Sequence, residues 1–398
     1  MPKISQRTLN MSESPIRKLA PLAVSAREKG LKVYYLNIGQ PDLPTPKEGL
    51  DALKTVTRQV LEYSPSQGLA SYREKLIDYY AQYNMIMSPD DIIITTGGSE
   101  AILQVFMSIL DPGDEVIVPE PVYANYMTFA KGAGGVVRPI TTHIEDGFAL
   151  PGVEEFEKLI NERTRAIMIC HPNNPTGSVY TDKELEQLRD LVKKYDLYLI
   201  SDEVYREYIY TGTPYKSAFT LEGIEENVII IDSVSKRYSE CGIRIGALIT
   251  KNEEVRKSAM KMCQARLSPP LLGQIVAEAS LSAPKSYFQH TYEEFIARRN
   301  ILVDLLNKIP GVYSPMPMGA FYTVASLPVE DAEDFCKWCL SDFNHEGETV
   351  MMAPAAGFYA TPGIGKNQVR IAYVLNIEDL KRAVLVLEKA LEAYAQRH

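Results

Sequence analysis

The stretch Val228-Ile-Ile-Ile-Asp-Ser-Val-Ser-Lys236-Arg-Tyr-Ser-Glu-Cys-Gly-Ile-Arg244-Ile-Gly246 joins an apolar run to a group of hydroxyl and cationic side chains. Its first four residues are apolar and β-branched, which predicts a strand buried on both faces. Lys236 stands at the mouth of that strand, where a lysine is costly to bury unless it has a chemical role. One interpretation is a Schiff base with an aldehyde cofactor, whose phosphate Ser233 and Arg244 would hold. The other is a surface lysine near a turn, and this segment alone does not decide between them.

Five other apolar runs alternate with helical patterns between about residue 90 and residue 250, namely Ile92–Thr95, Glu115–Val118, Arg165–Cys170, Leu197–Ile200 and Ile245–Thr250. This alternation is typical of an α/β protein with a mostly parallel sheet covered by helices. Apolar residues recur at intervals of three and four from Ile102 to Leu110, which predicts a helix that Asp111-Pro-Gly113 ends. A second region begins near Pro284, with a helical pattern around 292–306 and a C-terminal helix expected over 377–395.

Polar, aromatic and glycine-rich groups follow five successive strands, at the edge of the sheet where open α/β folds bind ligands. They are Thr96-Gly-Gly-Ser-Glu100, Pro119-Glu-Pro-Val-Tyr123, His171-Pro-Asn-Asn-Pro-Thr-Gly177, Ser201-Asp-Glu-Val-Tyr205 and Asp232-Ser-Val-Ser-Lys236. Ordinary surface loops would show a scatter of lysine and glutamate instead. The combination suits a charged, aromatic and phosphorylated ligand, which favours the cofactor interpretation of Lys236.

Three of these motifs together resemble the class I/II aminotransferase family of pyridoxal-phosphate (PLP) enzymes of fold type I. They are Asn174-Pro-Thr-Gly177, Ser201-Asp-Glu-Val-Tyr205, and Ser233-Val-Ser-Lys236 with an arginine eight residues on. The similarity extends from Asn37-Ile-Gly-Gln-Pro-Asp42 to Arg370. It implies a seven-stranded sheet with helices on both faces in a large PLP-binding domain at 41–284, and a smaller α+β domain at 285–398. Residues 1–40 would form an N-terminal arm and part of the small domain, and the working species would be a homodimer.

The resemblance assigns the cofactor site residue by residue. Lys236 is the expected catalytic lysine, which forms the Schiff base with PLP and afterwards moves the substrate α-proton. Asp202 would pair with the pyridinium nitrogen and keep the ring an electron sink, which gives a carboxylate at a strand end its cationic partner. Tyr205 and Asn174 would contact the ring oxygen, and Tyr123 would stack on the ring.

The phosphate and substrate ends of the site are assigned in the same way. The implied phosphate ligands are Gly98, Ser99, Ser233, Ser235, Arg244 and, from the neighbouring subunit, Tyr63. Gly97-Gly-Ser99 also opens a helix, whose N-terminal amides suit a phosphate. Arg370 would bind the substrate α-carboxylate through two parallel hydrogen bonds, with Gly39 and Asn174 beside the same group. Glu203, next to the ring aspartate, is expected to be structural or to face solvent.

Composition and charge argue against several other classes of protein. The chain has 398 residues, of which 45% are hydrophobic and 23% charged, as in ordinary globular proteins. A net charge of -9 argues against a nucleic-acid partner. No apolar stretch approaches the ~20 residues of a membrane span, and no signal peptide is evident, so we expect a cytoplasmic protein without a membrane partner. The histidines show no metal spacing, and Cys336 and Cys339 are expected to pack in the core of a helix rather than bind a metal.

The expected function is ping-pong transamination between an L-amino acid and a 2-oxoacid such as 2-oxoglutarate, through the Schiff base at Lys236. Aspartate and an aromatic amino acid both remain open as the donor. Arg266 could bind an acidic side chain or form an interface salt bridge, although the arginine usual in the family falls nearer Cys263. Phe321 and Tyr322 could line a pocket for an aromatic side chain. Another PLP reaction on the same fold, such as a carbon–sulfur lyase, is the alternative.

Overall fold

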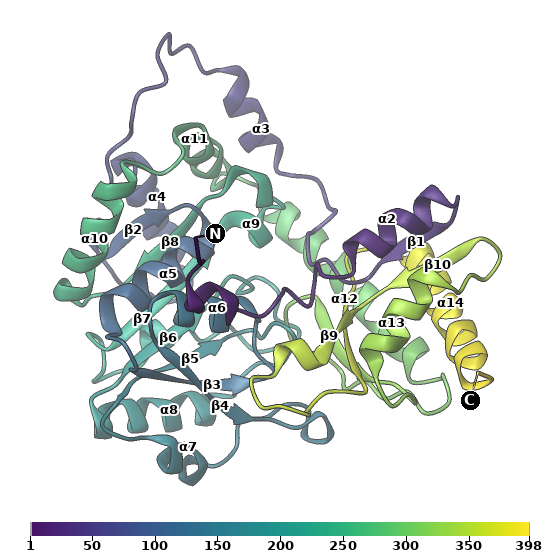
Figure 1. The fold of residues 1–398 in the computed structure, drawn as a ribbon. Coiled ribbons are helices and arrows are strands. Elements are labelled where there is room, and N and C mark those ends of the chain that lie inside the picture. Colours follow the sequence, from purple (N-terminus) through teal and green to yellow (C-terminus); the bar gives the residue numbers. More distant parts are fainter. Residues whose placement is uncertain (1, 398) are drawn as a thin grey trace.

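A seven-stranded sheet organises the larger of two bodies in the computed structural model, which describes residues 2–397 (Figure 1). The strand order is β2-β8-β7-β6-β5-β3-β4. Only β8 runs antiparallel to its neighbours, so the predicted mostly parallel seven-stranded sheet is confirmed. The strands are β2 (Ile92–Thr95), β3 (Glu115–Glu120), β4 (Val136–Thr141), β5 (Thr164–Cys170), β6 (Tyr198–Asp202), β7 (Val228–Ser233) and β8 (Gly246–Ile249).

The strand β4 is the one member of this sheet that the sequence pattern does not reveal. It lies at the edge, paired only with β3, and its side chains are mostly exposed or half-buried. Arg138 and Pro139 interrupt its apolar run. An edge strand tolerates both residues, because one side of its ladder needs no partner.

Helices cover both faces of this sheet, as expected for strands that are apolar throughout. Within β2, Ile93 belongs to one core cluster and Ile92 and Ile94 to the other, because successive side chains of a strand point to opposite faces. One face packs against α5 (Gly97–Ile109), α6 (Asn125–Gly132) and α10 (Glu253–Arg266). The other packs against α4 (Ala70–Ala81), α8 (Asp182–Tyr195) and α11 (Leu271–Ser280).

Shorter elements complete the large body. They are α3 (Lys47–Lys54), α7 (Val153–Leu159), α9 (Val234–Arg237), and the 3-10 turns η1 (Pro89–Asp91), η2 (Ile144–Asp146), η3 (Ala218–Thr220) and η4 (Cys241–Ile243). The single turn α9 follows β7 directly and carries Lys236. The sheet therefore presents this lysine at the edge where its parallel strands end.

The smaller body combines the N-terminal and C-terminal parts of the chain. The strand β1 (Lys32–Tyr35) pairs in parallel with β10 (Glu348–Met351), and a second sheet has the order β11-β12-β9. The other elements are α2 (Ala20–Glu28), α12 (Lys285–Leu306), β9 (Tyr322–Ser326), α13 (Ala332–Ser341), β11 (Ala353–Pro354), η5 (Ala355–Phe358), β12 (Gln368–Ala372) and α14 (Ile377–Ala395). The domain boundaries at residues 40 and 284 stay predictions.

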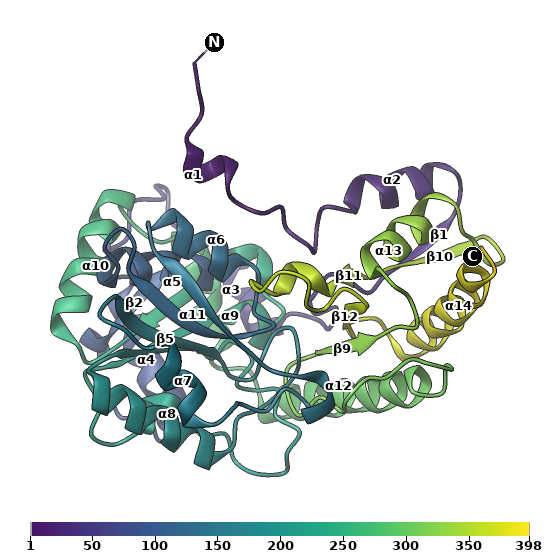
Figure 2. The same ribbon diagram turned by 60° about the horizontal axis from the view of Figure 1, so that its bottom comes forward.

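The N-terminal segment runs from one body to the other. Its first turn, α1 (Gln6–Leu9), lies beside α6 of the large body, and α2 packs against α13 of the small body (Figure 2). Cys336 and Cys339 are buried on α13 in the core. Among residues 2–397, no helix is both long and apolar enough to cross a membrane.

Candidate active site

The candidate site lies where the two bodies meet at the ends of the parallel strands. Hydrogen bonds cross between the bodies there, and two of them join residues predicted for the site. The Lys236 amine donates to the carbonyl of Gly39 at 2.7 Å, and Nη1 of Arg370 donates to Oδ1 of Asn174 at 3.1 Å. Four residues predicted from separate motifs are thus brought together.

Lys236 is half-buried on α9, and its amine also lies 3.8 Å from the Cys241 sulfur. Burial lowers the pKa of Lys236, and the positive charges of Arg370 and Arg244 add to this, against an opposing effect of the Cys241 thiol. A lysine that loses its proton more easily is a better nucleophile and a better base at neutral pH. The environment therefore suits a lysine that reacts rather than one that only carries charge.

Asp202 is buried at the last position of β6. Its Oδ2 accepts a hydrogen bond from the Tyr126 hydroxyl at 2.5 Å, and its Oδ1 accepts one from the Val204 amide at 3.3 Å. Residues 2–397 offer it no ion pair. Burial raises the pKa of Asp202 to about 6, and the charges of Asp232 and Glu203 contribute in the same direction. A buried carboxylate of this kind is stabilised by a cationic partner, which a ligand would have to supply.

Arg370 is a buried guanidinium on β12, with 1% of its surface exposed. Besides the bond to Asn174, its Nη2 donates to the carbonyl of Asn37, and its Nε is buried without a hydrogen-bond partner. The described residues 2–397 pair no carboxylate with it, and burial lowers its pKa. An unpaired buried guanidinium matches the planar, two-oxygen geometry of a carboxylate ligand.

Aromatic hydroxyls surround the space between these groups. The Tyr205 hydroxyl lies 3.5 Å from Nδ2 of Asn174, which donates to it, and 2.9 Å from the Tyr322 hydroxyl. Tyr123 is half-buried and meets the ring of Tyr126 edge-on at 5.4 Å between centroids. Tyr205 and Asn174 therefore contact one another, while Tyr123 contacts Tyr126, the residue that holds Asp202.

The five expected phosphate residues of this chain gather at the start of α5. Gly97 has a φ of +74°, and a β-carbon there would overlap the Arg244 guanidinium, so glycine is needed for their close approach. The next residues are Gly98 and Ser99, and the first amides of a helix have no partner within it. The Ser233 hydroxyl lies 2.8 Å from that of Ser235, at the start of α9. Helix amides, hydroxyls and a guanidinium are groups that could together hold an anion.

Tyr63 is exposed over 76% of its surface in the single chain. Arg266 forms an ion pair with Glu100 at 2.6 Å and donates to the Ser66 carbonyl at 2.8 Å. Its salt bridge is therefore made within one chain, at the base of the segment that carries Tyr63. Cys263, near which the family's arginine was expected, is buried in the core.

Several residues of the site escape the sequence motifs. Tyr126 donates a hydrogen bond to Asp202 and lies on α6, three residues after Tyr123. In the sequence, this helical spacing from Tyr123 is the feature that could have indicated its place in the site. The sequence suggests Tyr322 only as a possible pocket wall, yet its ring lies 4.6 Å from the Arg370 guanidinium. Phe321 packs in the core behind the site, stacked on Phe295, and so does not line the substrate space.

Comparisons with known proteins agree with this geometry. The sequence profile of the family "Aminotransferase class I and II" matches residues 32–387. An aspartate aminotransferase of Thermotoga maritima is 34% identical over 390 residues, which is 96% of this chain and 98% of the relative. A probable aspartate/prephenate aminotransferase of Thermus aquaticus is 31% identical over 99% of this chain and 98% of its own length.

Solved structures show the same fold. The crystal structure of the Thermotoga maritima aspartate aminotransferase superimposes with a TM-score of 0.88 at 32% identity, over 98% of this chain and all of that one. An alanine aminotransferase from Pyrococcus furiosus gives a TM-score of 0.89 at 30% identity, with the same coverage. These relatives are aminotransferases, which favours transamination over the carbon–sulfur lyase alternative. The chain is therefore an enzyme of the class I and II aminotransferase family, with the architecture of fold type I.

Proposed function

We propose that this chain binds PLP at Lys236 and transfers the amino group of L-aspartate to 2-oxoglutarate. The observation that carries the proposal is that, among residues 2–397, the buried carboxylate of Asp202 has no cationic partner and the buried guanidinium of Arg370 has no anionic one. A pyridinium nitrogen would satisfy the first group and a substrate carboxylate the second. The anion site at the start of α5 fits the phosphate of the same cofactor.

When bound, PLP supplies an electron-withdrawing ring conjugated with the reacting carbon, which makes the α-proton of an attached amino acid acidic. With the cofactor bound, Asp202 would keep a positive charge on the ring nitrogen, and Tyr126 orients Asp202. Asn174 and Tyr205 would hold the ring oxygen. Arg370 fixes the α-carboxylate and thereby the direction in which the α-proton points. Lys236 would hold the cofactor, and its amine would be the base that takes up and returns the substrate α-proton.

A panel of amino acids with 2-oxoglutarate, read by formation of the matching oxoacid, tests this proposal. The expected result is oxaloacetate from aspartate, with weaker reactions from aromatic donors. Preference for an aromatic donor would overturn the choice of substrate but leave the reaction type intact. Loss of ammonia or of a sulfur group without formation of the amino form of the cofactor would overturn the reaction type.

A free cation at the mouth of the site favours an acidic substrate. Arg17 follows Ile16, whose carbonyl accepts a hydrogen bond from Nδ2 of Asn37 at 2.7 Å, next to Arg370. Burial raises the pKa of Tyr123, and the positive charges of Arg370 and Arg17 oppose this rise. Among residues 2–397 its guanidinium has no hydrogen bond or ion pair, and it is exposed. We therefore assign it to the side-chain carboxylate of aspartate.

Replacing Arg17 by glutamine should weaken the half-reaction with aspartate and spare that with alanine. One lost charge-assisted hydrogen bond corresponds to roughly a 10-fold rise in the KM for aspartate. Stopped-flow measurement of each donor's half-reaction checks this. Arg7→Gln is the matched control, because the Arg7 guanidinium donates instead to the Gly132 carbonyl at 3.1 Å. Equal losses with aspartate and alanine would show that Arg17 does not recognise the side chain.

We further propose that the working species is a homodimer in which Tyr63 reaches the phosphate in the partner's site. The segment that follows α3 stands away from the body of the molecule (Figure 1), and its apolar residues Val60 and Leu61 are exposed by 70% and 59%. Exposed apolar side chains next to one another mark a surface that another molecule covers. A second copy, related by a two-fold axis, would place both Tyr63 side chains at the shared sites.

Mixing Tyr63→Ala protein with Lys236→Ala protein should restore activity that neither has alone. In a mixed dimer, the site built on the Tyr63→Ala chain has its own Lys236 and an intact Tyr63 from the partner. Half of the dimers in an equal mixture are mixed and each has one complete site, so recovery should reach up to about a quarter of wild-type activity. Asp202→Asn mixed with Lys236→Ala is the control, because both defects lie in the owner's site and no complete site forms. No recovery despite demonstrated subunit exchange would place Tyr63 outside the partner's site.

A further inference from the structure

Four residues of the candidate site have a direct sequence neighbour in one buried ionic cluster. The cluster consists of Glu203, Arg206, Glu207, Asp232 and Arg237. The neighbouring pairs are Asp202 with Glu203, Tyr205 with Arg206, Ser233 with Asp232, and Lys236 with Arg237. In each of these pairs, one side chain belongs to the candidate site and its neighbour in sequence belongs to the ionic cluster.

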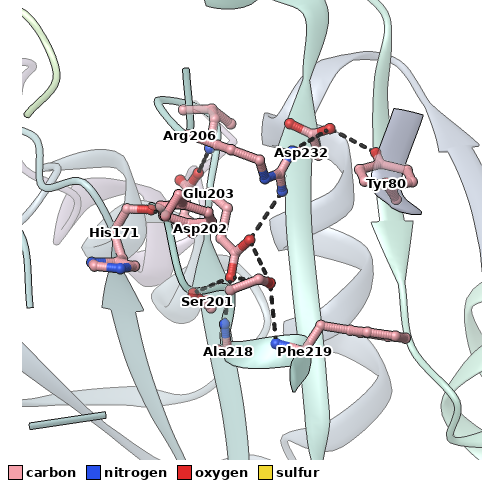
Figure 3. A network of polar contacts seen from close by, with 12 residues as sticks. Tyr80, His171, Ser201, Asp202, Glu203, Arg206, Ala218, Phe219 and Asp232 are labelled. Carbon is pink, nitrogen blue, oxygen red and sulfur yellow. Dashed lines mark hydrogen bonds and ion pairs between the residues drawn. The ribbon is translucent and has the colours of Figure 1, made fainter. Parts of the chain in front are cut away.

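Asp232 is the centre of the cluster. Its Oδ2 contacts Nη1 of Arg206 at 3.2 Å and Nη2 of Arg237, and it accepts a hydrogen bond from Tyr80 at 2.6 Å. Its Oδ1 accepts a hydrogen bond from the amide of Ser233 at 2.8 Å. Figure 3 shows Arg206 between Glu203 and Asp232, with Tyr80 on the far side of Asp232. One carboxylate thus links β7, through its own backbone, to two arginines from different segments.

The two arginines extend these links to the other elements. Nη2 of Arg206 pairs with Glu203 at 3.0 Å, directly after β6. Nε of Arg237 pairs with Glu207 at 2.8 Å, and its guanidinium lies 3.9 Å from the centre of the Tyr79 ring. Glu203 in turn accepts hydrogen bonds from the hydroxyls of Ser201 and Ser217 and from the amide of Ala218. The sequence allows two roles for Glu203, a structural one or a solvent-facing one. The structure shows the structural role, because Glu203 does not face solvent.

Burial makes this cluster expensive to maintain. The side chains of Arg206 and Glu203 are fully buried, and those of Arg237 and Asp232 are exposed by only 1% and 3%. Burial alone would raise the pKa of Asp232, yet Arg206 and Arg237 hold it below its usual range, so the carboxylate stays charged. Apolar residues of similar volume often give equal or greater stability than buried ion pairs. Stability alone therefore does not account for five charged residues at this place.

We propose that Arg237 and Asp232 are positioning residues, which fix α9 with Lys236 relative to β6 with Asp202. The helix α9 has four residues and so little internal hydrogen bonding to hold its direction. Arg237 fastens its far side to Asp232 and Glu207, while the Tyr208 hydroxyl holds the carbonyl of Lys236 at 2.6 Å. The distance between the lysine amine and the ring aspartate then depends on the cluster.

Arg237→Lys is the sharpest variant, because lysine keeps the charge but cannot span both Asp232 and Glu207. Asp232→Asn is the second variant, which removes the central charge. The matched control is Arg256→Lys, which alters another partly buried arginine–aspartate pair of the large body, Arg256 with Asp91 at 2.8 Å. Each purified holoenzyme is measured for thermal unfolding, bound cofactor per chain, kcat and KM for one donor, and the visible circular dichroism of the bound cofactor.

In Arg237→Lys, kcat should fall by roughly 10-fold to 10²-fold while the KM changes far less, since a small misplacement of reacting groups acts on the chemical step. The circular dichroism per bound cofactor should change, because it reports how the ring sits in its asymmetric surroundings. Arg256→Lys should match the wild type in kcat and circular dichroism.

The proposal is overturned if cofactor-loaded Arg237→Lys retains the wild-type kcat and circular dichroism, even with a lower unfolding temperature. The cluster would then serve stability alone. If Asp232→Asn does not fold, the result with Arg237→Lys alone decides whether the cluster has a positioning role. The inference rests on the proposed PLP chemistry. Measurements on the wild-type protein distinguish a failure of the proposed function from a failure of the positioning role. A wild type without bound cofactor or transamination refutes the proposed function, whereas an active wild type with an equally active variant refutes only the positioning role.

Discussion

Replacing Lys236 by alanine should lower kcat for transamination by on the order of 10⁴-fold or more, the upper end of what a single proton-transfer group contributes. The substitution removes two functions at once, because the same amine attaches the cofactor and moves the α-proton. It should leave the fold intact, since among residues 2–397 the amine donates one hydrogen bond to the Gly39 carbonyl and a long one, at 3.8 Å, to the Cys241 sulfur. Oxoacid formation in a single turnover, with protein saturated with PLP, gives the measurement.

Lys257→Ala is the control for this experiment, because Lys257 is exposed on α10 and forms its ion pair with Glu253 on the same helix. Its activity should equal that of the wild type. A Lys236→Ala protein that turns over within about 10-fold of the wild type would mean that another group moves the proton, since a positioned acid–base group contributes at least ~10²-fold.

Asp202→Asn should fold and bind the phosphate end of PLP, yet lose on the order of 10²-fold or more in the proton-transfer step. Asparagine has nearly the same shape and can still accept the hydrogen bond of Tyr126, but it carries no charge to oppose that of the ring nitrogen. A deuterium label on the α-carbon of the donor reports the affected step, because the isotope effect should grow in the variant. Normal turnover would show that Asp202 only caps the end of β6.

The same substitution should stabilise the cofactor-free protein at neutral and alkaline pH. The folded-state pKa of Asp202, about 6, lies above the usual value of 3.8, so folding favours the protonated form. The cost of the buried charge is absent below pH 4, grows between pH 4 and pH 6, and is complete above pH 6. Unfolding of the cofactor-free Asn variant above pH 6 should therefore require more free energy than that of the wild type, by at most about 3 kcal/mol. A difference in unfolding free energy between the variant and the wild type that is the same at pH 4 and at pH 8 would contradict this pKa.

Much of the fold could be predicted from local patterns. The six apolar runs coincide with strands β2, β3, β5, β6, β7 and β8, and the helix at 377–395 matches α14. The pairing of β1 with β10 joins Lys32 to Glu348, parts of the chain about 316 residues apart. The sequence around either strand does not indicate which distant strand it pairs with. The strand β4 was missed because an edge position tolerates a charge and a proline, which a pattern search takes for a loop.

The residues of the candidate site differ in the same way. Lys236, Asp202 and Arg370 stand in motifs whose chemistry is visible in sequence, because each places a charge at the end of an apolar strand or within one. Arg206 and Arg237 give no such signal. An arginine two to four residues from a strand usually faces solvent, and only the tertiary structure shows that both are buried against carboxylates. The motifs thus indicate the groups proposed to touch ligands, while the groups proposed to hold them in place follow from packing.

The central claim is that PLP is bonded to Lys236, and borohydride tests it most directly. Reduction of the holoenzyme should bleach its yellow absorbance and fix one pyridoxyl group per chain. Digestion and mass spectrometry should then find this label on the peptide that contains Lys236, and on none of the other lysines. A label on a different lysine, or an unlabelled chain that nevertheless transaminates, would contradict the assignment of the site.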